Sequence, residues 1–525
     1  PIGEFDRDHW AYQPIEPVEV PENTSDWIRN PIDRFVLKHL QERNLVPQPA
    51  ASKQTLIRRL SFDLTGLPPS PAATEAFTTA QRVDAYERLV DRLLLSPDYG
   101  RRWAQHWLDL ARFAETDGFE HDKIRPQAWK YRDWVVAAFN DDLPYDEFIR
   151  QQLAGDELYP GVESAQTATR FCLSGPDMPD INLIEERRHT VLNEIASTVG
   201  EVVLGLQIGC AQCHDHKYDP ISQADFYRFR AVFEPALKLR KNKSLSLFDE
   251  SVPYERSSHL MIRGDFRRPG PKVDPGVIRV AARDGFRFSP MPSQQTSGRR
   301  SALADWLVAS DNPLTSRVIV NRLWQHHFGR GLVSTPSEFG VMGDEPSHPE
   351  LLDWLASQLM REGWILRSLN RLIVTSATYR QRSRLPLRAN ESEKQAWERC
   401  LENDPAAIHL SRYPRWRLEG EAIRDAMLAA SGTLNRTSGG PGVLPPLPKE
   451  LVTTLLKNQW PVTPDVSQHQ RRSIYVFARR NLRYPIFEVF DRPSANASCS
   501  ARQTSTTATQ SLHLMHSRFS LATAQ

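Results

Sequence analysis

Apolar side chains recur every three to four positions along most of the chain, the spacing that puts them on one face of an α-helix. The first such stretch follows Asn30-Pro31, and this pair is a common helix start. Between residues 52 and 115 the spacing is interrupted at a Gly-Leu-Pro-Pro turn and at Ser96-Pro97, which predicts four shorter helices. Another helical stretch begins at residue 129, and we expect it to end at Gly155.

The spacing of apolar residues changes twice after residue 185. A long amphipathic run over residues 186–213 ends at two cysteines, and residues 236–298 are then rich in Lys, Arg, Ser, Pro and Gly, with short β-like pieces. Helices return from about residue 300, including one from Leu314 to Phe328, and "RRSIYVFARR" is strand-like.

These patterns predict a mainly α protein, with two helical domains packed together around a loop-rich or small β middle segment. We divide the chain into an extended N-terminal segment (1–30), a first helical domain (31–235), a linker or small β element (236–298) and a second helical domain (299–525).

Composition narrows the class of protein. Hydrophobic residues make up 40% and charged residues 25% of the 525 residues, which is typical of a globular protein. The formal net charge of +2 argues against a general nucleic-acid binder, and no run of about 18 apolar residues predicts a transmembrane segment. The opening "PIGEFDRDHW" lacks the apolar core of a signal peptide, and we interpret both chain ends as cut edges of a longer protein.

The five cysteines are few and unevenly placed. Three are isolated, and an odd number makes a disulfide framework a poor explanation. The other two form Cys210-Ala-Gln-Cys213-His214, and C-x-x-C-H is the attachment sequence of c-type haem. Two thiols one turn apart can reach the two vinyl groups of one porphyrin, and His214 is then expected to be the proximal iron ligand. The sequence therefore predicts haem c as the cofactor.

Other uses of the cysteine pair stay open. A zinc ribbon needs a second cysteine pair, and a thioredoxin-like redox site needs a βαβ pattern; neither occurs here. Binding of another metal and a purely structural thiol pair are the remaining alternatives. Nucleotide cofactors are not expected, because no G-x-G-x-x-G follows a strand and no Walker A sequence is present.

Several long motifs carry a resemblance to a known family. "GCAQCHDHKYDPISQADFYRF", "RRWAQHWLDLARFAETDGFE" and "ADWLVASDNPLTSRVIVNRLWQHHFGRGLV" resemble a family found mainly in planctomycetes, whose members pair a cytochrome-c-associated domain with a second domain of unknown function. The resemblance spans nearly the whole chain apart from its opening and its middle. It implies export to the periplasm or the cell surface, where c-type haem is attached, and says little about activity.

Three histidines are candidates for the distal side of the haem or for catalysis. His326 and His327 lie near the end of the predicted 314–328 helix, and we favour His327 because its helical face is apolar. His106 lies on a similar face of an earlier helix. The alternative for each is an ordinary core histidine.

Two further groups carry charge. The loop "ETDGFEHDKIRP" offers Asp117 or Glu120 as a base and Arg125 as an anion or sugar clamp, unless it is only a solvated face. Lys217, close to the cysteines, could pair with a haem propionate. Ser347 with Glu350 is explained as a helix start signal.

The function that these features favour is a periplasmic or cell-surface c-type haem oxidoreductase. We expect it to oxidise a carbohydrate or related substrate, because thirteen tryptophans suit sugar stacking, and to pass electrons to a partner cytochrome. The alternatives are a non-catalytic electron-transfer or scaffold protein, and a metal-dependent hydrolase without haem.

Overall fold

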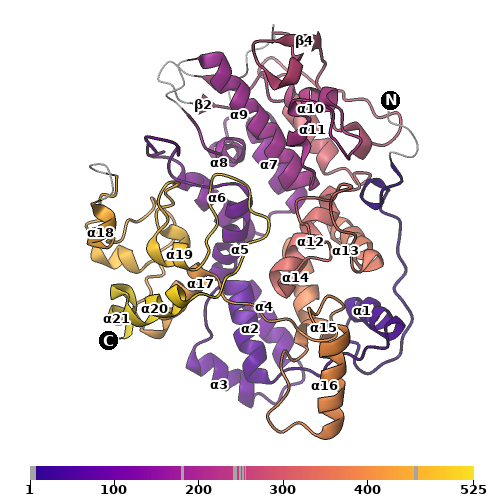
Figure 1. Ribbon diagram of the computed structural model, residues 1–525, viewed down its shortest axis with the longest axis vertical. Helices are drawn as coiled ribbons and strands as arrows, with labels where there is room; N and C mark the ends of the chain where they lie inside the picture. The colour runs from indigo at the N-terminus through magenta and orange to yellow at the C-terminus, as the bar shows by residue number, and fades with distance from the viewer. Residues whose placement is uncertain are drawn as a thin grey trace.

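The computed structural model describes residues 7–178, 183–239, 245–247, 250, 254, 256–453 and 459–524 (Figure 1). It confirms a mainly α protein. The described residues contain four short strands, all in the middle segment, which form two antiparallel pairs, β1 with β2 and β3 with β4. The β3–β4 hairpin lies at one end of the longest axis and helix α16 at the other (Figure 1).

The helices of the first half are α1 (Pro31–Glu42), α2 (Lys53–Thr65), α3 (Pro71–Thr79), α4 (Ala85–Leu94), α5 (Pro97–Leu110), α6 (Trp129–Asn140), α7 (Tyr145–Leu158), α8 (Glu163–Ala168), α9 (Ile184–Val199) and α10 (Gln223–Arg230). The strands are β1 (Lys238–Leu239), β2 (Leu245–Ser246), β3 (His259–Met261) and β4 (Pro269–Lys272). The helices of the second half are α11 (Arg299–Leu307), α12 (Thr315–Phe328), α13 (Pro349–Arg361), α14 (Leu366–Thr375), α15 (Ala377–Arg380), α16 (Glu391–Asn403), α17 (Gly420–Ala430), α18 (Lys449–Val452), α19 (Pro485–Val489), α20 (Ala508–His516) and α21 (Arg518–Ala524).

Polar caps explain where many of the early helices begin. The side chain of Asn30 accepts a hydrogen bond from the backbone of α1, and the backbone nitrogen of Asn30 donates one to the Asp33 carboxylate. Together these bonds form a capping box. Ser96 caps α5 in front of Pro97, as the break in the sequence pattern predicted. The C-terminal end of α12 is also confirmed: Gly329 closes it in the left-handed conformation, with φ of 75°.

The expected helix end at Gly155 is confirmed only in part. The regular helix from Tyr145 breaks at Ala154, where φ is −143°, but a further turn then carries α7 to Leu158. A Cβ atom at position 155 would overlap the carbonyl oxygen of Ala165 on α8. The glycine is therefore also needed for the close approach of two helices.

The strand expected over residues 471–480 is also wrong. This segment forms a short 3₁₀ helix, η9 (Ser473–Tyr475), and makes only isolated bridges to the loop before α18. Its four arginines are buried, and two of them are in ion pairs: Arg472 lies 2.5 Å from both Asp98 and Asp425, and Arg479 lies 2.8 Å from Asp122. The polar positions thus face carboxylates from distant segments instead of solvent, which the alternating pattern cannot reveal.

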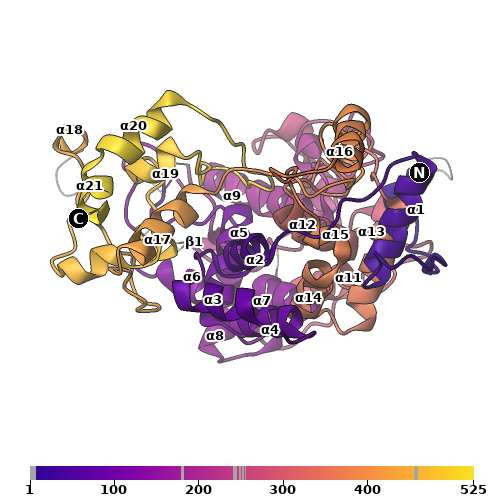
Figure 2. The same ribbon diagram turned by 90° about the horizontal axis from the view of Figure 1, so that it is seen from below.

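Both halves of the chain share one hydrophobic core. A single buried cluster runs from Ala11 to Ala478 and includes residues of α5 and α12, which lie side by side in Figures 1 and 2. Buried Arg300 at the start of the second half binds Asp156 of the first, 2.7 Å away. We conclude that the two helical parts form one packed unit, as the sequence predicted.

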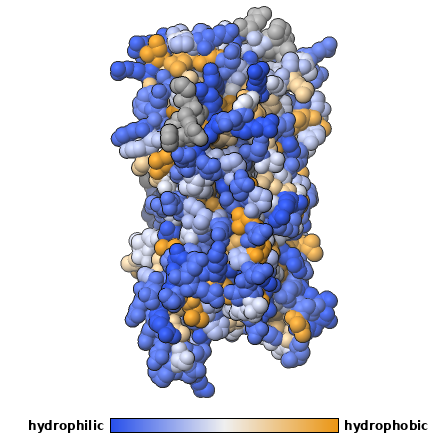
Figure 3. Space-filling model, turned by 90° about the vertical axis from the view of Figure 1, so that its right-hand side faces the viewer, coloured by the Kyte–Doolittle hydropathy of each residue, from blue (hydrophilic) through white to orange (hydrophobic). Residues whose placement is uncertain are grey.

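The face of the molecule shown in Figure 3 is mostly polar. On the face in Figure 3, hydrophobic residues are scattered in small groups among hydrophilic ones, as is normal for a protein surface. In the described part of the chain, no helix combines the length and apolar character that crossing a bilayer requires.

Candidate functional site

The C-x-x-C-H segment lies in a short, separate turn between α9 and α10. The run of helix before it ends in a π-helical turn, η4 (Gly200–Leu204), and a left-handed Gly205 then reverses the chain into the 3₁₀ helix η5 (Ile208–Gln212). Ile208 packs so closely on Gly200 that a Cβ there would lie 2.6 Å from it. This packing fixes the turn, while Cys210 and Cys213 are unpaired and exposed.

Residues of helix α10 form hydrogen bonds with the C-x-x-C-H segment. The carbonyl oxygen of Gln212 accepts hydrogen bonds from Gln223 Nε2 (2.8 Å) and Tyr227 Oη (3.1 Å). The Asp215 carboxylate accepts a third, 2.7 Å long, from the backbone nitrogen of Gln223. Because the backbone is fixed on both sides of Cys213, the two thiols have a defined position relative to each other.

The orientation of His214 suits a metal ligand. Its Nδ1 lies 2.6 Å from the carbonyl oxygen of Asp215, which can only accept, so Nδ1 carries the proton. Nε2 then holds a lone pair, and no residue in the described chain contacts it. A backbone carbonyl on Nδ1 is the usual way in which a protein orients a metal-binding imidazole.

The β3–β4 hairpin packs closely on one of the two thiols. Gly264, in the turn of the hairpin, lies against Cys213, and a Cβ at that glycine would be 2.8 Å from Sγ. Two unpaired, exposed thiols followed by a suitably oriented imidazole are the residues that would hold a c-type haem.

The other charged residues of the motif have different roles. The Asp219 carboxylate accepts hydrogen bonds from Tyr12 Oη (2.7 Å) and the backbone nitrogen of Val341 (2.8 Å), so it ties two distant segments together. His216 Nδ1 accepts from the backbone of Asp219 at 2.9 Å. Lys217 is exposed, with its ammonium 5.0 Å from the ring centre of Tyr218, and remains available to an anionic group.

A second polar site lies where α5 and α12 meet. His106 of α5 stacks on His326 of α12, with ring centroids 3.6 Å apart and an angle of 23° between the planes. Trp103 meets His326 edge-on at 5.9 Å. No hydrogen bond from the described residues reaches a nitrogen of either imidazole. The structure therefore brings together two of the histidines that the sequence singled out.

Both imidazoles of this pair are held neutral. Burial lowers the pKa of His326 to about 3, against the attraction of Glu419. Burial, and then the neighbouring His326, lowers the pKa of His106 well below its usual value. At neutral pH each ring thus keeps an unprotonated nitrogen that can accept a proton.

A network of ion pairs surrounds the histidine pair. Arg102 binds Glu419, and Arg502 binds Asp109 and Glu421, both at 2.7 Å. Although burial opposes it, the two arginines lower the pKa of Glu419 to about 2. These residues are up to 400 positions apart in the sequence, so no local pattern could have assigned them to one site.

An aromatic side chain lies beside the same helix end. Trp416 is 39% exposed, and its indole is so close to Gly329 that a Cβ there would be 2.8 Å away. Gly329 comes three residues after His326. The exposed indole therefore lies at the same end of α12 as the histidine pair.

His327 occupies a different environment from His326. Its side chain is fully buried, its Nε2 lies 2.9 Å from Asn370 Oδ1, and its backbone oxygen accepts from Tyr413 Oη at 2.7 Å. None of its contacts in the described chain comes from the C-x-x-C-H segment. The apolar face that favoured His327 in the sequence is the face that turns it into the core.

Asp117 and Arg125 bind each other. Their side chains form an ion pair at 2.6 Å, and the two terminal nitrogens of Arg125 donate to the carbonyl oxygens of Leu173 and Gly175. Nearby, buried Asp122 binds Arg479 at 2.8 Å. With its donors occupied, Arg125 holds the loop against residues 173–175, and the Asp122–Arg479 pair ties it to the second half of the chain.

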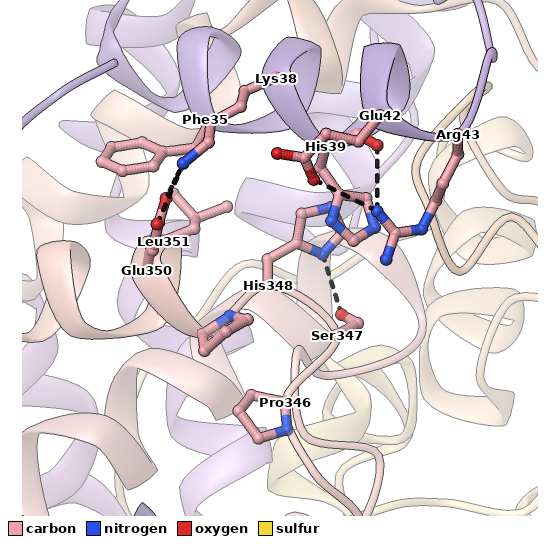
Figure 4. A pocket seen from close by; sticks show the side chains of 11 residues that line it. Phe35, Lys38, His39, Glu42, Arg43, Pro346, Ser347, His348, Glu350 and Leu351 are labelled. Carbon is pink, nitrogen blue, oxygen red and sulfur yellow. Dashed lines mark hydrogen bonds and ion pairs between the residues drawn. The ribbon is translucent and has the colours of Figure 1, made fainter.

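A cavity of 320 Å³ lies between α1 and the start of α13, next to three histidines (Figure 4). The rings of His39 and His348 lie 3.9 Å apart, and His39 Nε2 is 2.9 Å from His409 Nδ1. A helix starts here as expected, but its N-cap is His348 and not Ser347, whose Oγ lies 3.0 Å from His348 Nδ1. Among the described residues, no group of three or more His, Cys, Asp or Glu side chains is arranged to hold a metal ion.

Comparison with known families covers most of the chain. Residues 31–238 match the family described as PSCyt2, protein of unknown function (DUF1549), and residues 299–525 match PSD1, protein of unknown function (DUF1553). The first name points to a cytochrome-associated family. No curated protein and no solved structure matches the chain.

Proposed function

Since the chain joins a PSCyt2 domain to a PSD1 domain, we propose that it is a c-type haem oxidoreductase of the periplasm or cell surface. Cys210 and Cys213 carry the haem through thioether bonds, and His214 binds the iron through Nε2. When bound, the haem supplies a one-electron acceptor.

The observation that carries this proposal is the geometry of His214. The short contact between Nδ1 and the Asp215 carbonyl leaves Nε2 as the nitrogen with the lone pair, directly after two unpaired thiols. A structural thiol pair would not need this arrangement, and neither would a redox pair that forms a disulfide.

We assign proton transfer from the substrate to the stacked histidines, His106 and His326. Oxidation of a hydroxyl group to a carbonyl releases two electrons and two protons. The electrons would leave one at a time through the haem to two molecules of the partner cytochrome, while one proton would go to a neutral imidazole of His106 or His326 and the other to solvent. Trp416 provides a stacking surface close by. We therefore propose a carbohydrate or a related polyol as substrate, with a partner cytochrome as the electron acceptor.

Non-catalytic electron transfer is the second candidate. It is favoured by the exposure of Cys210, Cys213 and His214, which would leave part of a bound haem at the surface, where a partner protein can approach. The hydrolase alternative is weaker, because the described residues offer no set of metal ligands.

The proposal is tested by producing the chain in a bacterial periplasm that contains the haem-attachment machinery. We expect a c-type α-band and haem that survives acid–acetone extraction, both lost in the double variant Cys210→Ala/Cys213→Ala. The control is Cys499→Ala, which removes a cysteine outside the motif. Protein without covalent haem under these conditions would refute the proposal.

The two candidates differ in their response to sugars. An oxidoreductase should reduce its own haem when mixed with the correct sugar, whereas an electron-transfer protein should do so only through a reduced partner. A panel of sugars, including acidic and sulfated ones, with the haem spectrum as readout separates the two.

A further inference from the structure

The β3–β4 hairpin and the segment that follows it carry an excess of positive charge. Residues 260–288 contain seven Lys or Arg and three Asp, although the whole chain has a formal charge of only +2. Arg263, Arg268 and Lys272 are exposed, and their side chains form no ion pair with a described residue. These three charges are therefore not neutralised by a close carboxylate partner in the described fold.

The positive surface continues into a cavity at the C-terminal end of α10. This cavity, of 450 Å³, is lined by five arginines and a single acidic residue, Asp274. Three of the arginines are paired with Asp225, Asp284 and Asp311. The other two, Arg228 and Arg287, have no carboxylate partner among the described residues. We call Arg228, Arg263, Arg268, Lys272 and Arg287 the basic surface.

The basic surface begins at the cysteine motif itself. Gly264, next to Arg263, is in contact with Cys213, as described above. Gln223 Nε2 donates both to Gln212 O (2.8 Å) and to Met261 O (3.0 Å), so it joins the motif to the hairpin. Arg228 lies on the same helix as Gln223, a little more than one turn further on.

We propose that the basic surface is the docking site of an acidic electron-carrier protein, which it guides to the cysteine segment. Redox partners associate through small, transient interfaces, where complementary charge raises the rate of encounter more than it raises the affinity. Unpaired cations around one exposed edge of a redox group provide such complementarity. This inference rests on the proposed haem at Cys210 and Cys213.

The test uses the haem-loaded full chain and a charge-reversed hairpin, Arg263→Glu/Arg268→Glu/Lys272→Glu. The matched control is Arg384→Glu/Arg388→Glu/Arg399→Glu, three exposed arginines at or before α16, at the opposite end of the longest axis (Figure 1). Electron transfer from the reduced protein to an acidic and to a basic cytochrome c is followed by stopped-flow at low and high salt.

We expect the hairpin variant to react with the acidic cytochrome about ten times more slowly at low salt, with the difference disappearing at high salt. Its reaction with the basic cytochrome should become faster, and the control should match the wild type. Equal rates for the hairpin variant and the wild type, or equal losses in both variants, would overturn the docking site.

Failure of the docking site can be told apart from failure of the proposed haem. A missing α-band refutes the haem, whereas a normal α-band with unchanged rates refutes only the docking.

Equilibrium binding of the same acidic cytochrome, with no redox step, tests the basic surface independently. Loss of binding in the hairpin variant supports the docking site, and no binding to the wild type overturns it. A hairpin variant that loses only heparin binding would assign the surface to anionic polysaccharides instead, against this inference.

Discussion

At the scale of single residues, the neighbouring histidines of α12 show how one position changes a side chain's role. His326 stacks on His106 and its nitrogens have no hydrogen bond from a described residue, while His327 is buried against Asn370. The sequence could predict that a histidine at this helix end matters, because a glycine follows and the helix is apolar. It could not predict which of the two, since that depends on how α5 and α14 pack around this end of α12.

Substitution of these two histidines should have opposite effects. His326→Ala should keep the protein folded but lower the rate of sugar-dependent haem reduction by about 10²- to 10⁴-fold, because a proton acceptor is lost. His327→Ala should lower the free energy of unfolding by about 3 kcal/mol, because it leaves a cavity and an unpaired Asn370. Urea unfolding and the haem reduction assay measure the two effects. If His327→Ala lost activity at full stability, the assignment would be reversed.

At the scale of elements, capping residues in the sequence predict where helices start. Contacts between segments that are distant in the sequence cannot be predicted in this way. Asn30 and Ser96 define where α1 and α5 begin through hydrogen bonds within a few residues, so the sequence was sufficient there. Gly155 looked like a helix end, but its role is set by α8. The segment 471–480 looked like a strand because its buried arginines resemble exposed ones in the sequence.

The packing of α7 against α8 can be tested at Gly155. Gly155→Ala should lower the free energy of unfolding by about 1–3 kcal/mol, although alanine favours helices, because its methyl group would overlap the backbone of Ala165. Gly276→Ala is the matched control, since the nearest atom to its Cβ is 3.6 Å away, and it should change stability little. A stabilised Gly155→Ala variant, measured by urea unfolding, would show that the helices can separate at no cost.

The contact between α1 and α13 should be sensitive to acid. Burial lowers the pKa of His39 to about 4 and also lowers the pKa values of His348 and His409. Groups with a lowered pKa bind fewer protons in the folded state, so their contribution to stability is complete above about pH 6.5 and is lost as the pH falls towards 4.

The charged groups that face this cluster are Lys38, Glu42 and Arg43 on α1, Glu350 on α13, and Asp404 in the loop after α16. The variant His348→Phe keeps the ring stack and removes one titrating group. We expect its urea midpoint to fall less between pH 7.5 and pH 5 than that of the wild type. The same fall in both proteins would place the acid-sensitive groups elsewhere.

At the scale of the whole molecule, the two family segments meet in both their core and their candidate chemistry. The histidine pair takes one ring from each, and Arg102 of the first segment binds Glu419 of the second. The C-x-x-C-H segment could be found from its spacing alone. The histidine site could not be assembled from the sequence, because its members are brought together only by the packing of the two segments.

The ion pairs of Asp98 have a consequence for how the chain is made. This buried carboxylate binds Arg101, three residues away, but also Arg436 and Arg472, which are synthesised more than 330 residues later. Until then the first segment carries an acidic group that is only partly neutralised and an apolar surface that is only partly covered. Such a nascent chain should depend on chaperones, and expression of residues 31–238 alone should give insoluble protein.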